Sequence, residues 1–173
     1  AYEGMVVMDL GRPGDLSSHH SMDPGCLPSF FLVWDPQGGR PSDEAHQDLK
    51  RRWQRGDPGV KLAVEAFRDL VDEGLRLLEG RNFDGFRDAM DRNFDLREKI
   101  FQVGERDREM VALARRCGAG AKLCGSGGAV IGLPRSESDF TFLEREYLKA
   151  GYHFLRPQVK KPGLETNSGM AEA

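Results

Sequence analysis

The chain has 173 residues, of which 39% are hydrophobic and 31% charged, and its formal net charge is −3. This length and composition are typical of one globular domain, and the small acidic excess argues against general binding to nucleic acid or to a membrane surface. No apolar run approaches the roughly 20 residues that cross a bilayer. The first residues lack the basic region of a signal peptide and the three cysteines lack metal-ligand spacing, so we expect a cytoplasmic protein with free thiols.

Two short strands are predicted before the first helix. Residues 3–10 contain four consecutive apolar residues and predict a buried strand, and residues 29–34 predict a second strand of aromatic and branched residues. Residues 11–28 are rich in Gly, Pro and polar side chains and predict a loop. Three of its residues could be imagined as metal ligands: His19, His20 and Asp23. Adjacent histidines point in different directions, so a plain surface loop is favoured and we expect no metal ligand.

Helical periodicity dominates the rest of the chain. Five helices are predicted over residues 42–55, 58–79, 82–101, 106–117 and 136–150. Short strands are predicted at residues 119–123, 129–133 and 152–157, and residues 160–173 predict a disordered tail. Strands and helices are segregated rather than strictly alternating, which favours an α+β fold with helices packed on one face of a mostly antiparallel sheet.

The most distinctive stretch is GAGAKLCGSGGAVIGL, at residues 118–133. Lys122 lies just before a loop that joins two strand-length segments. The loop consists of Gly125, Ser126, Gly127 and Gly128. Glycine tolerates φ > 0 and lets a ligand approach the backbone, so such a loop can turn N–H groups toward an anion. The same pattern fits a tight hairpin between two core strands, which the spacing alone favours.

A second candidate site lies on the third predicted helix. Asn93 and Arg97 are four residues apart and share a face, where they offer an amide and a guanidinium to one neighbour, while Asp95 points elsewhere. Such a face can bind a ligand or form hydrogen bonds at the surface, and the pattern leaves both open. For the basic cluster at residues 50–52, a solvated face is favoured over contact with an anionic ligand or a neighbouring domain.

Together with its neighbours, the glycine stretch resembles the third conserved motif of the GHMP kinases. Four further stretches extend the resemblance: YEGMVVMDL (residues 2–10), AHQDLKRRWQRGDP (45–58), MDRNFDLREKIF (90–101) and REMVALARRCGAGAK (108–122). They cover roughly residues 2–157 in order and look like the C-terminal half of the glucuronokinase group, sugar 1-kinases that phosphorylate D-glucuronate. Several motifs in the right order are stronger evidence than one glycine loop.

The resemblance implies a ferredoxin-like C-terminal domain that forms one wall of the cleft of an ATP-dependent kinase, which converts D-glucuronate to glucuronate 1-phosphate at the anomeric hydroxyl. It implies that residues 1–10 are a strand from the end of a missing N-terminal kinase domain, residues 11–158 the C-terminal domain and residues 159–173 a disordered tail. No stretch matches the family's main phosphate loop. The catalytic aspartate and most of the Mg²⁺ site would then lie upstream, and this chain would be inactive alone.

The resemblance also implies roles for the candidate residues. Lys122 and the loop of residues 125–128 would lie on the phosphate side of the cleft, and Asn93, Asp95 and Arg97 on the sugar side. Arg97 would pair with the glucuronate carboxylate, because a planar guanidinium suits a planar anion. The expected partners are ATP, a small sugar acid and the N-terminal domain of the same protein, with no nucleic acid and no membrane.

Three positions depart from the glucuronokinase pattern. Glu44 stands where the group has lysine, Asp91 where it has asparagine and Cys124 where threonine is commoner. These changes leave the fold prediction intact and bear on which sugar is bound. Two alternatives therefore stay open: another GHMP sugar kinase, acting on a heptose phosphate or on fucose, and a non-catalytic ferredoxin-like module that binds a ligand.

Overall fold

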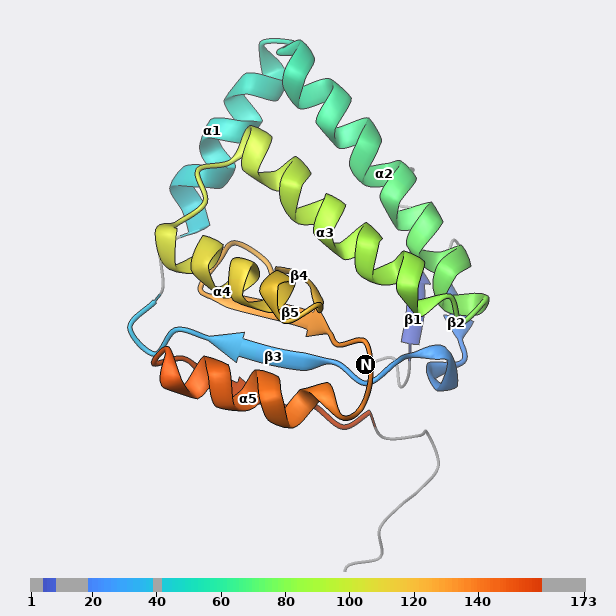
Figure 1. The fold of residues 1–173 in the computed structure, drawn as a ribbon. Coiled ribbons are helices and arrows are strands. Elements are labelled where there is room, and N and C mark those ends of the chain that lie inside the picture. The colour runs from blue at the N-terminus through green and yellow to red at the C-terminus, as the bar shows by residue number, and fades with distance from the viewer. Residues whose placement is uncertain (1–4, 9–18, 39–41, 160–173) are drawn as a thin grey trace, which may run out of the picture. The chain divides into compact units, whose positions relative to one another are not determined.

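The computed structural model describes residues 5–8, 19–38 and 42–159. The chain divides into two compact units, one of Pro28–Pro157 and the other of Ala1–Leu27 with Gln158–Ala173. The larger unit contains β3 (Phe31–Trp34), α1 (Ser42–Gln54), α2 (Pro58–Glu79), α3 (Phe83–Ile100), α4 (Glu105–Arg116), β4 (Gly120–Leu123), β5 (Ala129–Leu133), α5 (Asp139–Lys149) and β6 (His153–Leu155) (Figure 1). The smaller unit contains β1 (Met5–Met8), β2 (His19–Met22) and the short 3-10 helix η1 (Pro24–Cys26).

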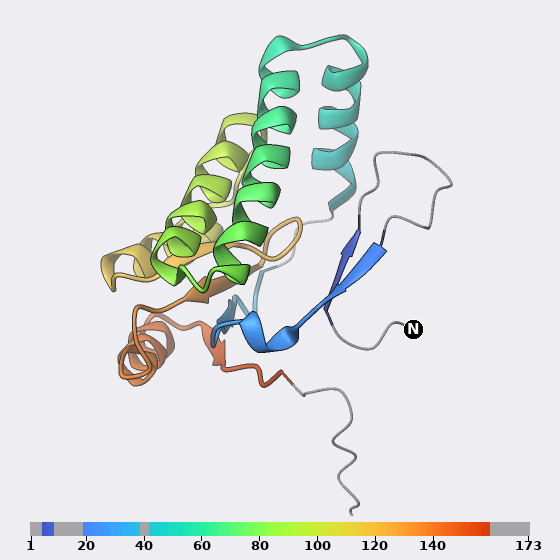
Figure 2. The same ribbon diagram turned by 90° about the vertical axis from the view of Figure 1, so that its right-hand side faces the viewer.

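The smaller unit contains a strand that the sequence did not predict. β1 and β2 pair antiparallel, with Met5 opposite Met22 (Figure 2). The prediction that residues 11–28 form only a loop is therefore wrong for β2. The segment His-His-Ser-Met has little β propensity, so its pairing depends on backbone hydrogen bonds to β1 rather than on a local pattern. Residues 5–7 are half-buried rather than buried as predicted, since a two-stranded ribbon by itself covers little surface.

One of the imagined metal ligands has a structural role. Asp23 accepts a hydrogen bond from the backbone N–H of Gly25 at 2.8 Å and caps η1. The side chains of His19 and His20 lie outside the described residues, as does the predicted tail at residues 160–173.

The larger unit is built on a four-stranded antiparallel sheet in the order β4-β5-β3-β6. In Figures 1 and 2, α4 and α5 lie on the same side of this sheet. Phe31 and Val33 of β3 point into the core between the sheet and these helices and are fully buried, whereas Trp34 is 37% exposed. Met110 of α4 and Tyr147 of α5 fill the core from the helical side. The predicted α+β fold is confirmed.

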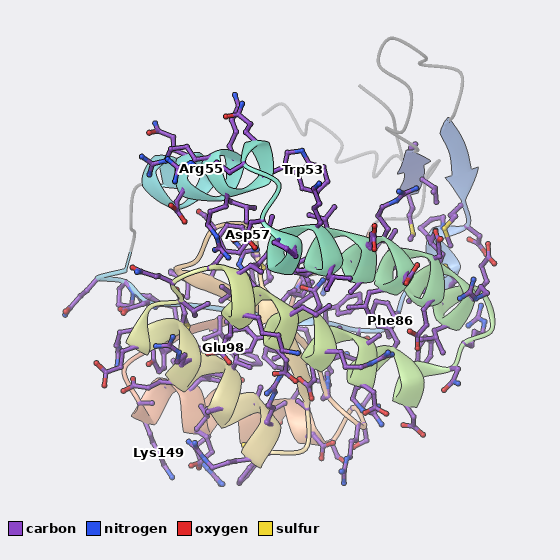
Figure 3. The ribbon with its side chains drawn as sticks, turned by 90° about the horizontal axis from the view of Figure 1, so that it is seen from above. Trp53, Arg55, Asp57, Phe86, Glu98 and Lys149 are labelled. Atoms are coloured by element: carbon purple, nitrogen blue, oxygen red, sulfur yellow. The ribbon has the colours of Figure 1, made fainter. Side chains whose placement is uncertain are left out.

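A corner between α1 and α2 is tied to the end of α3. Asp57, labelled at this corner in Figure 3, caps α2 by accepting hydrogen bonds from the N–H groups of Gly59 and Val60. Arg52 of α1 pairs with Asp57 at 3.0 Å and donates to the carbonyl of Ile100 at 3.0 Å. Arg52, one of the three basic residues at positions 50–52, therefore links α1 to the start of α2 and to the end of α3.

α3 lies against the edge strand β4 so closely that no side chain fits at position 120. A Cβ on Gly120 would lie 2.6 Å from the carbonyl oxygen of Arg87 in α3. The outward N–H of Ala121, on the edge of β4 that no strand covers, donates to Oδ1 of Asp91 at 3.0 Å. Arg115 of α4 pairs with the same carboxylate at 3.1 Å. Asp91 therefore joins α3, α4 and β4.

A substitution at Gly132 tests how tightly the core is packed. Gly132 of β5 lies opposite Phe31, and a Cβ there would lie 2.0 Å from the Phe31 ring, which is fully buried and stacks on Phe154. We expect Gly132→Ala to lower the free energy of unfolding by about 1–3 kcal/mol in urea denaturation, because the ring cannot move aside without disturbing the core. Gly74→Ala in α2 is the control, since its Cβ would meet Phe86 at 3.4 Å, an ordinary contact, and alanine favours a helix. Equal losses in the two variants would contradict this explanation.

Candidate functional site

The loop between β4 and β5 has the conformation that its glycines permit. Gly125, Gly127 and Gly128 have φ angles of +82°, +138° and +80°, a region that other residues rarely adopt. The pairing of β4 with β5 confirms the predicted hairpin. Within the described part of the chain, no group accepts a hydrogen bond from the backbone N–H of Gly125 or Ser126. These two residues form the corner of a turn, in which the N–H of Gly127 is directed to the carbonyl of Cys124. The N–H groups of Gly125 and Ser126 are therefore free to bind a ligand.

The end of the loop is held by two other elements. The carboxylate of Asp107, in the first turn of α4, accepts a hydrogen bond from the N–H of Gly128 at 2.7 Å. The N–H of Asp35, just after β3, donates to the carbonyl of Gly128 at 3.2 Å. Sequence reasoning missed Asp107. Its only signal was an acid in the first turn of a helix, which is common for the ordinary reason that it complements the helix dipole.

Arg97 of α3 and Lys122 of β4 are both partly buried beside this hairpin. Burial lowers the pKa of the Lys122 ammonium and the charge of Arg97 lowers it further, while the Cys124 thiol acts in the opposite sense. Burial also lowers the pKa of Arg97, partly offset by Asp107. Two positive charges thus lie near each other where solvation is reduced, which is unfavourable unless an anion is bound.

Neither cation has a carboxylate partner among the described residues, within the 4.0 Å that defines an ion pair. The Nζ atom of Lys122 donates to the neighbouring carbonyl of Leu123 at 3.0 Å. The guanidinium of Arg97 lies over the ring of Phe101, 4.7 Å from its centroid. An aromatic ring accepts no conventional hydrogen bond, so the N–H groups of the guanidinium can still bind an anion.

The structure brings together some of the predicted site residues and separates others. Asn93 lies one helical turn before Arg97 on the same face of α3 and is half-buried. Asp95 pairs instead with Arg115 of α4 at 2.8 Å, which places it with Asp91 rather than with Arg97. Arg97, Lys122 and the glycine loop therefore form the candidate site, with Asn93 beside it.

Two of the three positions that depart from the glucuronokinase pattern have described side chains, and these lie in different surroundings. Cys124 is at the entrance of the loop, where burial raises the pKa of its thiol and the charge of Lys122 partly opposes this. Asp91 has the structural contacts already described. The side chain of Glu44 lies outside the described residues.

A hollow of about 260 Å³ lies at the end of β4 away from the glycine loop and is lined by Asp84, Arg87, Asp88, Asp91, Arg115, Gly118, Ala119, Gly120 and Arg135. Its charges largely satisfy one another, because Arg87 pairs with Asp84 and Arg115 with Asp91.

Over the described ranges, no three His, Cys, Asp or Glu side chains gather as a metal site. In the same ranges no helix has the length and apolar character needed to cross a membrane.

Comparison with known proteins gives a consistent result. The family model described as "GHMP kinases C terminal" matches residues 63–153. Two Arabidopsis thaliana proteins are similar to this chain: "Probable glucuronokinase 2", 36% identical over 159 residues, and "Glucuronokinase 1", 33% identical over 161 residues. These matches cover 86% and 87% of this chain but only 43% and 44% of the two relatives. The chain thus spans less than half the length of the relatives it matches.

A solved structure has the same fold. L. major mevalonate kinase, in complex with R-mevalonate, superposes with a TM-score of 0.63 over 76% of this chain and 44% of that protein. At 21% sequence identity, this likeness concerns the fold alone.

Replacing Lys122 tests whether its charge is held for a ligand. Because its pKa is lowered in the folded chain, the charged form opposes folding at neutral pH, and stability rises as the pH climbs toward the ordinary lysine pKa of about 10. We expect Lys122→Met to raise the free energy of unfolding at pH 7 by about 0.5–2 kcal/mol in urea denaturation, a gain that shrinks toward pH 10.

The exposed Lys50 provides the matched control. Lys50→Met should change stability little at pH 7. A Lys122→Met chain that is less stable than the wild type at pH 7 would show that the ammonium stabilises the fold.

Proposed function

This chain belongs to the GHMP kinase family as a C-terminal domain, and we propose that it forms one wall of the active site of an ATP-dependent sugar kinase. The family resemblance in the sequence motifs is thereby confirmed. The observation that carries the proposal is the pair of partly buried cations, Arg97 and Lys122, beside the free backbone N–H groups of Gly125 and Ser126. Phosphoryl transfer depends mainly on positioning and on stabilising negative charge, which such a wall supplies.

Lys122 and the loop of residues 125–128 are assigned to the phosphate side. An ammonium and backbone N–H groups together suit phosphate oxygens, which carry charge on several atoms. Lys122 lies on the strand that leads into the loop, so the same anion can meet both. ATP is the phosphate donor that this assignment implies.

Arg97 is assigned to the carboxylate of a sugar acid, with Asn93 available for a sugar hydroxyl. The names of the two matched relatives favour D-glucuronate as the acceptor, phosphorylated at its anomeric hydroxyl to glucuronate 1-phosphate. The guanidinium of Arg97 lies over the Phe101 ring, and its fork of N–H donors suits a planar carboxylate. Asp95, held by Arg115, would act through the position of α3 rather than by contact.

The residues of this site do not fit Mg²⁺, which kinases use with ATP. Two cations repel a divalent metal, and the nearby carboxylate of Asp107 is already bonded to Gly128. The metal would therefore be held by the ATP phosphates and by residues outside this site. A kinase domain N-terminal to this one is the proposed partner, since the matched relatives are more than twice as long as the matched segment.

The experiment is a phosphotransfer screen of the natural protein that contains this chain. D-glucuronate, D-glucose, fucose and a heptose phosphate are offered with ATP and Mg²⁺, and we expect D-glucuronate to be preferred. Preference for fucose or for the heptose phosphate would assign the site to another sugar kinase. Absence of transfer to every acceptor would refute the kinase proposal and favour a binding module.

Arg97→Glu then tests the sugar side. We expect the KM for D-glucuronate to rise at least about tenfold, since a charge-assisted hydrogen bond contributes about 1.5–3 kcal/mol, while the KM for ATP is unchanged. Lys99→Glu, the same charge reversal at an exposed position two residues along α3, is the control and should leave both values near those of the wild type. Identical kinetics for the two variants would remove Arg97 from the site.

A further inference from the structure

Both backbone polar groups of Gly128, its N–H and its carbonyl, form hydrogen bonds with other elements. Its N–H donates to Oδ1 of Asp107 at 2.7 Å, and its carbonyl accepts from the N–H of Asp35 at 3.2 Å. The first contact comes from the start of α4 and the second from the end of β3. Of the two, only the contact with Asp107 uses a side chain, so it is the one that a substitution can remove.

The Asp107 carboxylate also limits which residue can occupy position 127. A Cβ on Gly127 would lie 2.6 Å from Oδ2 of Asp107, well inside van der Waals contact. One oxygen of Asp107 therefore bonds the loop while the other lies against it. The loop and the carboxylate fit each other as a pair, and the tip at Gly125 has no atom within 4 Å of where its Cβ would be.

Asp107 also faces the positive side of the site. Its charge acts on Arg97 and partly offsets the effect of burial on that guanidinium, although the two are not within ion-pair distance. Asp107 thus influences both halves of the site: the loop by a hydrogen bond and Arg97 through space. A first-turn acid that served only the helix dipole would do neither.

We propose that Asp107 is a positioning residue that holds the glycine loop in the conformation in which its free N–H groups bind the phosphates of ATP. This inference rests on the proposed function, because it takes ATP as the ligand of the loop. Asp107 does not itself touch the substrate. It acts through Gly128, and the free N–H groups of Gly125 and Ser126 are the groups that it presents.

Three variants of the natural protein test the proposal in phosphotransfer assays. Asp107→Ala removes the acceptor, Asp107→Asn keeps an acceptor oxygen without the charge, and Glu105→Ala removes another acid from the same first turn, where Glu105 is exposed. We expect Asp107→Ala to lower kcat/KM for ATP on the order of tenfold to a hundredfold, because a displaced binding group costs about that much. Asp107→Asn should recover most of this loss, and Glu105→Ala should match the wild type.

Amide hydrogen exchange on the 173-residue chain supplies a readout that does not depend on activity. Exchange at the Gly128 amide should quicken by about tenfold in Asp107→Ala, which is the loss of one net hydrogen bond, and should stay near wild type in Asp107→Asn and Glu105→Ala. Equal exchange in Asp107→Ala and the wild type would overturn the inference, and so would equal kcat/KM for ATP in an active protein. If the wild-type protein shows no phosphotransfer, the proposed function is refuted, and the assignment of ATP to the loop with it. The exchange data would still decide whether Asp107 holds Gly128.

Discussion

The close approach of α3 to β4 is the contact on which the candidate site depends. Gly120 lies against the backbone of Arg87, the N–H of Ala121 donates to Asp91, and Lys122 lies near enough to Arg97 for the two charges to interact. Helix and strand therefore advance in the same direction, and each residue of β4 meets the next turn or two of α3. The packing that covers the edge of the sheet is also what brings the two cations together.

The acids near the site have partners other than the two cations. The Asp107 carboxylate accepts a hydrogen bond from the N–H of Gly128, the Asp35 carboxylate pairs with Arg106, and the Asp91 carboxylate accepts from the N–H of Ala121 and pairs with Arg115. Arg97 and Lys122 are left without a carboxylate partner among the residues described. Under the proposed function, these two unpaired charges would be in place before an anion binds, as in preorganised binding sites.

The sequence predicted what depends on local pattern and missed what depends on packing. Helical periodicity, the glycine hairpin and the i, i+4 pair of Asn93 and Arg97 are local features, and they lie in the structure as expected. β2 pairs through its backbone, so its side chains carried no signal. Asp107 and Gly128 are 21 residues apart, and Asp95 and Arg115 are 20 apart. Partners at that separation are chosen by how α3, α4 and the hairpin pack, which spacing along the chain does not reveal.

The fit between Phe31 and Gly132 also restricts how this sequence can diverge. A larger residue at position 132 collides with the ring, while a smaller residue at position 31 leaves a void beside Phe154 and Tyr147, which both contact that ring. Either substitution alone lowers the free energy of unfolding. The two together conserve the volume of the core, so their effects on stability are not additive. Evolution can therefore exchange these two positions only as a pair, and homologous chains should show them changing together.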